Sequence, residues 1–269
     1  MNFETLTYEV DEKVVRIGLN RPKALNAVDG VMKKELLEAI KMVSKESEIL
    51  VAVIFGHGKS FSTGIDLKDQ AYNPWEHSPN GWGGHFDAMI NISKEIWELE
   101  VPVIIAVKGY CLGAGCDLAV TGDFTYASED AKFGEPEVRH GAFAPTLIIP
   151  WTMGMKKSKD FLLMGNTLTA YEAKEQGMIT DVFPLKSFDE EVEKCVRHLC
   201  KMPKPALKVA KKAINKGFEM MGMWEAIQYN RELITLLALN KTKEQREARN
   251  ELIRQKGLKA FLAERDSKF

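Results

Sequence analysis

The amino-acid sequence predicts an α/β (α+β) protein whose carboxyl-terminal part is all helical. Continuous apolar runs rich in β-branched residues, at 50–55 and 103–107, are typical of buried strands. Helical spacing of apolar residues separates these runs, and strand-forming residues become rare after Pro203. We therefore divide the 269 residues into a core at 1–202 and a helical region at 203–269.

The single elements follow in order from local patterns. Residues 5–10 and 14–19 alternate apolar and polar side chains, as the two strands of a hairpin do. Asp29 is suited to begin a helix, because its carboxylate can accept hydrogen bonds from the N–H groups of the first turn. The apolar face of that helix would carry Met32, Leu36, Ala39, Ile40 and Val43. In the helical region the spacing predicts helices at 205–216, 224–239 and 243–254.

A loop is expected between the two apolar strands, at roughly 70–85. It holds Trp75, Trp82, two prolines and three glycines. Loops this long in a compact domain usually have a function. We expect the glycines to allow movement and the two tryptophans to cover a bound ligand.

Bulk composition excludes several classes of protein. The formal net charge is -1, from 37 Lys+Arg and 38 Asp+Glu, so no overall charge favours nucleic acid or an anionic membrane. No run of about 18 apolar residues could span a bilayer, and the sequence opens without a basic or apolar leader. The four cysteines have neither zinc-site spacing nor the density of a secreted disulfide scaffold. We expect a cytoplasmic protein with reduced thiols and with no nucleic-acid or membrane partner.

Two phosphate-binding motifs are incomplete. The segment 56–60 resembles the end of a P-loop, but Val53 replaces the first glycine of that motif. The segment 113–115 resembles a dinucleotide-binding turn, but Leu118 stands where a third glycine is needed. The sequence therefore does not favour a nucleotide hydrolase or a dinucleotide-dependent enzyme.

A glycine-rich turn and two acidic residues are the candidate functional groups. The turn is Gly109-Tyr-Cys-Leu-Gly-Ala-Gly-Cys-Asp117, and the second acid ends the segment Phe133-Gly-Glu-Pro-Glu137. Glycine lets a backbone approach a ligand closely with its N–H groups. A carboxylate can then transfer protons beside a carbonyl that such groups hold. This combination indicates chemistry next to an activated acyl group.

These segments resemble the enoyl-CoA hydratase/isomerase (crotonase) superfamily, and the resemblance runs nearly from end to end. It includes the blocks 21–27, 61–67, 101–109, 169–178 and 257–265. The resemblance implies a crotonase-like spiral of ββα repeats, followed by helices that join subunits into a homo-trimer or homo-hexamer. It also implies an acyl-CoA thioester as the substrate, with no metal and no cofactor beyond the CoA of that thioester.

In this family two backbone N–H groups bind the thioester oxygen, and the matching residues here are Ile65 and Ala114. Attack at the β-carbon, or proton loss at the α-carbon, places negative charge on that oxygen, which the N–H groups stabilise. The second position is usually glycine, and alanine keeps the N–H group.

Asp117 and Glu137 match the catalytic acids of the family's hydratases, which hold a water between them and exchange protons with it and with the α-carbon. Hydratases usually have glutamate at the first position. They also commonly have glycine at the position of Pro145, where its N–H helps to place the water, and proline has no N–H. Dienoyl-CoA isomerases of the family pair Asp with Glu, but their third acid would also fall on Pro145.

The resemblance also assigns residues to the two ends of the substrate. Lys23 and Ala24 match positions along the CoA nucleotide and pantetheine, and Lys68 matches a lysine near the adenine. Aromatic residues could form an acyl pocket, or could serve as core or lid without ligand contact. Either of two histidines could also act as an acid or base. The expected acyl-pocket residues are Trp75, Trp82, His85, His140 and Phe143.

We expect a hydratase that adds water across the 2,3 double bond of an acyl-CoA thioester, or removes it. The alternatives are an enoyl- or dienoyl-CoA double-bond isomerase, and then an acyl-CoA hydrolase or a non-catalytic acyl-CoA-binding protein.

Overall fold

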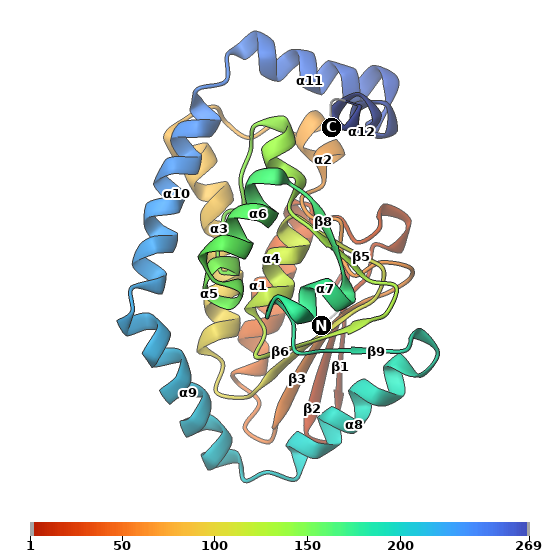
Figure 1. Cartoon of the computed structure of the whole chain (residues 1–269), viewed down its shortest axis with the longest axis vertical. Coiled ribbons are helices and arrows are strands. Elements are labelled where there is room, and N and C mark those ends of the chain that lie inside the picture. Colours follow the sequence, from red (N-terminus) through yellow and green to blue (C-terminus); the bar gives the residue numbers. More distant parts are fainter. Residues whose placement is uncertain (1–2, 268–269) are drawn as a thin grey trace.

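The computed structural model describes residues 3–267, whose strands form two sheets surrounded by helices (Figure 1). The larger sheet has six strands in the order β1-β2-β3-β4-β6-β9. Its first pair is antiparallel, and every other neighbouring pair is parallel. The six strands are β1 (Leu6–Asp11), β2 (Val14–Leu19), β3 (Val51–Gly56), β4 (Val103–Val107), β6 (Phe124–Ser128) and β9 (Asp181–Phe183).

The smaller sheet joins the two segments that carry the candidate acids. β5 (Tyr110–Leu112) runs parallel to β7 (Lys132–Gly134), which pairs antiparallel with β8 (Thr167–Thr169). The N–H of Gly113 donates to the carbonyl of Gly134 at 2.8 Å. This register places the helix that follows β5 beside the turn that follows β7.

Helices cover both faces of the larger sheet. They are α1 (Gly30–Val43), α2 (Leu67–Tyr72), α3 (Pro79–Glu98), α4 (Ala114–Thr121), α5 (Ile149–Met153), α6 (Met155–Met164), α7 (Ala170–Glu175), α8 (Phe188–Cys200), α9 (Lys204–Met220), α10 (Met223–Leu239), α11 (Lys243–Lys256) and α12 (Leu258–Asp266), with the 3-10 helices η1 (Pro22–Ala24), η2 (Pro136–His140) and η3 (Leu185–Ser187). On one face Val53 belongs to an apolar cluster with Phe188 of α8. On the other face Ile54 belongs to a cluster with Leu36 of α1 and Met89 of α3. Burial on both faces explains why the central strands read as continuous apolar runs.

The structure confirms most of the predicted elements. The hairpin of β1 and β2 turns at Glu12, which has a φ of 50°. The strand at 103–107 has the predicted bounds. Asp29 begins α1, and its Oδ1 accepts a hydrogen bond from the N–H of Met32 at 2.8 Å. All the residues predicted for the apolar face of α1 are buried, and Lys33 is buried with them.

The predicted loop at 70–85 is wrong in extent, because a helix begins inside it. The side chain of Ser78 caps α3, and the proline that follows suits a first turn. Only residues 73–78 therefore connect α2 to α3. Trp82 and His85 therefore lie on α3, and the helical backbone sets the directions in which their side chains leave the chain.

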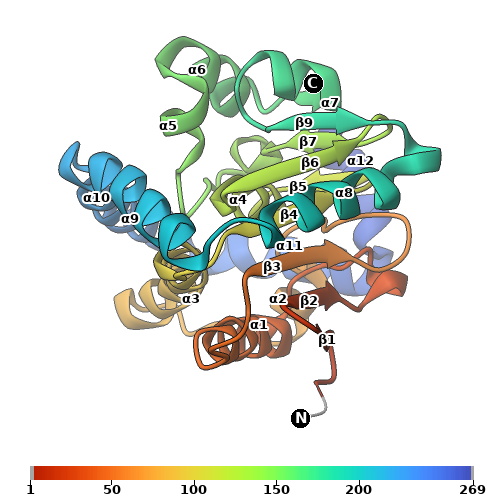
Figure 2. The same ribbon diagram turned by 90° about the horizontal axis from the view of Figure 1, so that it is seen from below.

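The carboxyl-terminal helices form an arm that runs along the core and returns over it. Helices α9 and α10 extend along one side of the molecule, and α11 and α12 lie across its end (Figures 1 and 2). α10 packs against α3, α11 against α2, and α12 against η2. The predicted fold class is confirmed, with longer carboxyl-terminal helices than the sequence indicated. The division at residue 202 stays a prediction.

Among the described helices, none has the length and apolar character needed to cross a membrane.

Candidate active site

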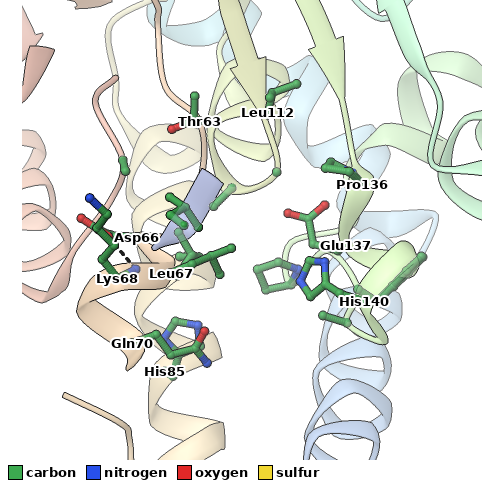
Figure 3. Close-up of a pocket in the computed structure, with 18 of the residues that line it drawn as sticks. Thr63, Asp66, Leu67, Lys68, Gln70, His85, Leu112, Pro136, Glu137 and His140 are labelled. Atoms are coloured by element: carbon green, nitrogen blue, oxygen red, sulfur yellow. Dashed lines mark hydrogen bonds between the residues drawn. The ribbon is translucent and has the colours of Figure 1, made fainter. Parts of the chain in front are cut away.

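A cavity of about 520 Å³ is lined by residues of both the core and the arm. In Figure 3, Asp66, Leu67 and Lys68 lie on one side of it, and Glu137 and His140 lie on the other. The lining includes every predicted site residue except Asp117, namely Lys23, Ala24, Ile65, Lys68, Trp75, Trp82, His85, Ala114, Glu137, His140 and Phe143.

Two glycines with left-handed backbone conformation bring the candidate oxyanion donors together. Gly64 has a φ of 81°, and a Cβ there would lie 2.7 Å from the carbonyl oxygen of Leu112. Gly113 has a φ of 54°, and a Cβ there would lie 2.1 Å from Oε1 of Glu137. Only glycine fits at both positions, so the backbone after β3 touches the turn before α4.

The N–H groups of Ile65 and Ala114 follow these glycines, and both residues line the cavity. Ala114 is the first residue of α4, where a helix leaves the N–H group without an internal partner. Within residues 3–267 neither of the two N–H groups donates to another residue. Two unused donors, one of them at a helix N-terminus, can together bind an oxygen that gains negative charge.

Glu137 presents one carboxylate oxygen to this turn. Oε1 lies against Gly113, whereas Oε2 is buried with no hydrogen-bond partner. Burial raises the pKa of Glu137, although the positive charge of Arg265 opposes the shift. A carboxyl group with a raised pKa beside free N–H donors is suited to acid–base catalysis near neutral pH.

Asp117 lies behind the cavity wall, in the first turn of α4, and its side chain is fully buried. Its Oδ2 accepts the N–H of Thr146 at 3.3 Å, and its Oδ1 has no partner. Burial raises the pKa of Asp117 to about 7; the hydrogen bond from Thr146 opposes this shift, and the charge of Glu137 adds to it. The two predicted acids are therefore electrostatic neighbours, but only Glu137 lines the cavity.

A third buried carboxyl group, that of Glu135, was not predicted from the sequence. The residue is 2% exposed, and neither of its carboxyl oxygens has a hydrogen-bond partner. Burial raises the pKa of Glu135 well above its ordinary range, and the charges of Glu137 and Asp117 raise it further. Its place two residues before Glu137, in the same motif, was the only signal in the sequence.

Pro145 lines the cavity and contributes no N–H group, as its ring requires. The N–H that reaches Asp117 belongs to Thr146. Asn230 of α10 fixes this turn, because its side-chain amide donates to the carbonyls of Ala144 at 3.0 Å and Pro145 at 3.1 Å. The arm therefore holds the segment beside Asp117, a role for Asn230 that sequence reasoning missed.

Of the residues assigned to CoA, Lys68 lies on the side of the cavity opposite Glu137 (Figure 3), and Lys23 and Ala24 also line the cavity. Lys23 and Lys68 are exposed, as groups that meet phosphates near solvent would be. Arg21 fixes the intervening backbone, because its Nη1 lies 2.9 Å from Oδ2 of Asp66. This ion pair ties η1, which contains Ala24, to the start of α2.

His85 is held by a buried lysine that the sequence analysis did not single out. The Nζ of Lys33 lies 2.9 Å from Nδ1 of His85, and the ring of Trp75 stacks on the imidazole at 3.4 Å between centroids. Burial lowers the pKa of His85 well below its ordinary range, and the charge of Lys33 lowers it further. Burial also lowers the pKa of Lys33 to about 8. His85 is therefore neutral, with Nδ1 accepting the hydrogen bond from Lys33.

His140 lies next to a group of basic residues from the arm. Burial lowers its pKa to about 3, and Lys241, Arg265 and Arg249 lower it further in that order. The Nζ of Lys241 also donates to the carbonyl of His140 at 3.2 Å. Neither His140 nor His85 carries a proton to donate as an imidazolium at neutral pH, which favours Glu137 as the acid–base group.

Among residues 3–267 no group of three or more His, Cys, Asp and Glu side chains is arranged to hold a metal ion. The four cysteines are free, and Cys111 and Cys116 are buried.

The chain is similar in sequence and in structure to proteins of one family. The family profile described as enoyl-CoA hydratase/isomerase matches residues 9–269. A protein named probable enoyl-CoA hydratase, from Rhizobium meliloti (strain 1021), is 32% identical over 272 residues, which cover 100% of this chain and 99% of that protein. The mitochondrial enoyl-CoA hydratase of Pongo abelii is 31% identical over 226 residues, which cover 81% of this chain and 76% of that protein. The crystal structure of an enoyl-CoA hydratase/isomerase from Xanthobacter autotrophicus Py2 has a TM-score of 0.94 and 32% identity, covering 100% of this chain and 99% of that one.

Proposed function

Because the chain belongs to the enoyl-CoA hydratase/isomerase family, we propose that it is an enoyl-CoA hydratase, which adds water across the 2,3 double bond of an acyl-CoA thioester or removes it. Family membership confirms the crotonase fold that the motifs predicted, and it identifies the protein as an enzyme. The names of the similar hydratases support the proposed reaction.

One observation carries the proposal: the carboxylate of Glu137 lies against the turn that carries the free N–H of Ala114, in a cavity that Ile65 also lines. Oε1 of Glu137 is against Gly113, and the next residue supplies the N–H of Ala114. The N–H of Ile65 lines the same cavity. A thioester oxygen held by both donors would place its acyl carbons next to Glu137, which is the geometry that acid–base catalysis requires.

In the proposed hydration, Glu137 takes a proton from water while the water oxygen bonds to C3 of the acyl group. The electron pair of the double bond moves toward C2 and the thioester oxygen, where the N–H groups of Ile65 and Ala114 stabilise the negative charge. Glu137 then gives the proton it took from water to C2, which restores the thioester carbonyl, completes the addition of one water and regenerates the carboxylate. We assign to Asp117 the role of partner to Glu137, because the two carboxyl groups act on each other electrostatically and Oδ1 of Asp117 is unpaired.

We further propose where the two ends of the substrate bind. Lys23, Ala24 and Lys68 would contact CoA, with the two exposed lysines near its phosphates. The acyl group would lie among aromatic residues that line the cavity, where it would meet side chains that bury large apolar areas. These residues are Trp75, Trp82, His85, His140 and Phe143.

A double-bond isomerase is the second candidate, and the surroundings of the acid pair favour it in two respects. Asp117 is shorter than the glutamate of most hydratases, and Pro145 has no N–H with which to hold a water. In an isomerase, Glu137 would move a proton from one acyl carbon to another, and no water would be consumed.

Mass spectrometry of the products separates the two reactions. The purified enzyme is offered a panel of enoyl-, dienoyl- and aryl-CoA thioesters. Hydration increases the substrate mass by one water, isomerisation leaves it unchanged, and hydrolysis releases free CoA. We expect a hydrated product with Glu137 intact and none in the Glu137→Gln variant. A product of unchanged mass would contradict the hydratase proposal and support the isomerase.

We also propose that the enzyme is a homo-trimer or homo-hexamer. Helices α9 and α10 and the turn between them expose many large apolar side chains, which would be unusual on a free monomer surface. Light scattering of the purified protein tests this proposal, and a monomer would contradict it. The exposed residues are Val209, Ile214, Met220, Met221, Tyr229, Leu233, Leu236 and Leu237.

A further inference from the structure

The cavity wall at α3 presents a side-chain nitrogen that is open to a ligand. His85 lines the cavity and is only 8% exposed. Its Nδ1 lies 2.9 Å from Nζ of the buried Lys33. Within residues 3–267 its Nε2 has no hydrogen-bond partner, and the protein does not enclose this atom. Since the rest of the side chain is buried, Nε2 of His85 opens into the cavity.

Lys33 determines which nitrogen of His85 carries the proton. Burial lowers the pKa of Lys33 to about 8, although the charges of Asp69 and Asp29 oppose the shift, so the ammonium form predominates at neutral pH. An ammonium group only donates hydrogen bonds, so Nδ1 of His85 is the acceptor. A neutral imidazole whose Nδ1 accepts carries its proton on Nε2. The pair therefore supplies an N–H donor to the cavity.

Aromatic rings hold the imidazole in place and surround it with apolar surface. The ring of Trp75 stacks on that of His85 at 3.4 Å between centroids, and Phe86 and Trp82 meet it edge to face at 5.2 and 6.3 Å. A purely apolar acyl group that filled the cavity would displace water from Nε2. The N–H would then be left without an acceptor, which is costly in apolar surroundings.

A second polar side chain of the cavity is in the same condition. Gln70 of α2 lines the cavity and is 7% exposed, and its side-chain amide has no hydrogen-bond partner in the described part of the chain. In Figure 3, Gln70 and His85 lie on the same side as Lys68, across the cavity from Glu137. The proposed reaction takes place at C2 and C3 beside Glu137. Gln70 and His85 would therefore face a more distant part of the acyl group.

We propose that the acyl group of the substrate carries an oxygen remote from C2 and C3, and that the N–H at Nε2 of His85 binds this oxygen, with the amide of Gln70 as a second donor. This inference rests on the proposed function, in which the N–H groups of Ile65 and Ala114 hold the thioester oxygen. A keto group, a hydroxyl group and a carboxylate share the required chemistry, because each accepts hydrogen bonds. Lys33 is a positioning residue that acts through His85.

Matched substrates test the preference for a second oxygen. A linear 2-enoyl-CoA is compared with thioesters of equal chain length that carry a keto group at each position from C5 onward, and with one that ends in a carboxylate. We expect kcat/KM to be about tenfold to a hundredfold higher for at least one oxygenated thioester, the usual effect of satisfying a buried donor. The keto and carboxylate arms distinguish a neutral from an anionic group. Equal or better turnover of the unsubstituted chain would overturn the proposal and leave the proposed hydration standing.

Variants assign the preference to the donor. His85→Phe keeps a flat ring but leaves the ammonium group of Lys33 buried without its acceptor, so it is combined with Lys33→Met. In this double variant the preference for the oxygenated thioester should fall by about tenfold or more. The matched control is His198→Phe, the same substitution at an exposed position of α8, which should keep the preference. A double variant with the preference of wild type would overturn the proposal.

Binding and NMR give readouts that do not require turnover. Saturated acyl-CoA analogues with and without the oxygen are titrated calorimetrically, and the oxygenated one should bind about tenfold more tightly. Nitrogen-15 NMR of His85 near neutral pH should show the proton on Nε2, with a change in the Nε2 signal when the oxygenated analogue binds. A proton on Nδ1 would overturn the proposal.

The same titrations separate this inference from the proposed function. Oxygen-dependent binding without any hydrated product would contradict the hydratase proposal and support the role of His85. Failure of both analogues to bind would overturn both proposals.

Discussion

Glu137 lines the wall of the cavity near α4 and η2, and the buried carboxyl groups of Glu135 and Asp117 lie behind that wall; His85 lines the wall near α1 and α3, and the buried Lys33 lies behind it. Burial raises the pKa values of the three acids and lowers those of the two bases. Both walls therefore favour neutral forms. The two sides differ in their hydrogen-bond partners. Nζ of Lys33 donates to Nδ1 of His85, whereas several carboxyl oxygens of the acids have no partner.

This difference indicates which wall is reactive. Buried groups that bond to each other, such as Lys33 and His85 with its ring stacked on Trp75, are held in place and are suited to shape a binding pocket. A buried polar group with unmet hydrogen bonds is costly and is often kept for function. We therefore expect substitutions in the acid wall to affect the chemical step, and substitutions in the basic and aromatic wall to affect the choice of substrate.

The largest effect is expected for Glu137→Gln. The substitution keeps the shape of the side chain and removes the proton-transfer group, so kcat should fall by about 10² to 10⁴ while CoA-thioester binding changes little. Steady-state kinetics with the preferred thioester measure the first quantity and calorimetric titration the second. Turnover near that of wild type would refute the assignment and direct attention to His140 or His85.

Asp117→Asn is expected to reduce activity and increase stability. Turnover should fall to a similar or smaller extent, and the double variant with Glu137→Gln should be hardly worse than the poorer single one, because the two residues act as a unit. The folded state holds the proton of Asp117 up to about pH 7, whereas the unfolded state releases it near its ordinary pKa of 3.8. Wild-type stability is therefore lost as pH rises through this interval.

Urea unfolding of wild type and Asp117→Asn at several pH values measures this cost. The stability gained by the variant should be close to zero near about pH 4 and should reach at most about 4 kcal/mol above about pH 7. A gain that is independent of pH would show that the ionisation of Asp117 is not its source.

Substitution of Trp75 and Trp82 together by alanine should change selectivity more than chemistry. Both residues line the cavity, and their rings contact each other at 5.2 Å between centroids. The ratio of kcat/KM values for bulky and short acyl thioesters should change by about tenfold or more, in line with the selectivity of apolar pockets. The affinity for CoA should remain the same. Equal losses for all thioesters would argue for a folding role of the two tryptophans.

Lys33→Met is expected to have the smallest effect on turnover, less than about tenfold. The substitution removes the charge that depresses the pKa of His85, so that pKa should rise but stay below its ordinary value, because burial is the larger cause. NMR titration of the histidine measures the pKa. An unchanged His85 pKa would show that the lysine does not act on it.

Much of the fold could be predicted because it depends on local patterns. The apolar run at 103–107 and the cap at Asp29 are read directly from neighbouring residues, and both are confirmed. The loop at 70–85 was misjudged for the opposite reason. Its glycines suggested irregular backbone, but Ser78 caps α3 and the packing of this helix against α1 and α10 outweighs their low helix propensity.

The sequence by itself determined which backbone could approach a substrate, since only glycine fits at 64 and 113, and it determined which acid follows the turn of β7. The tertiary structure alone decided that Asp117 lies behind the wall, that Lys33 reaches His85, and that Glu135 is buried without a hydrogen-bond partner. The physical reason is that propensity and spacing act between neighbours along the chain. Burial and charge, which set the protonation of these groups, depend on residues that the fold brings together from distant segments.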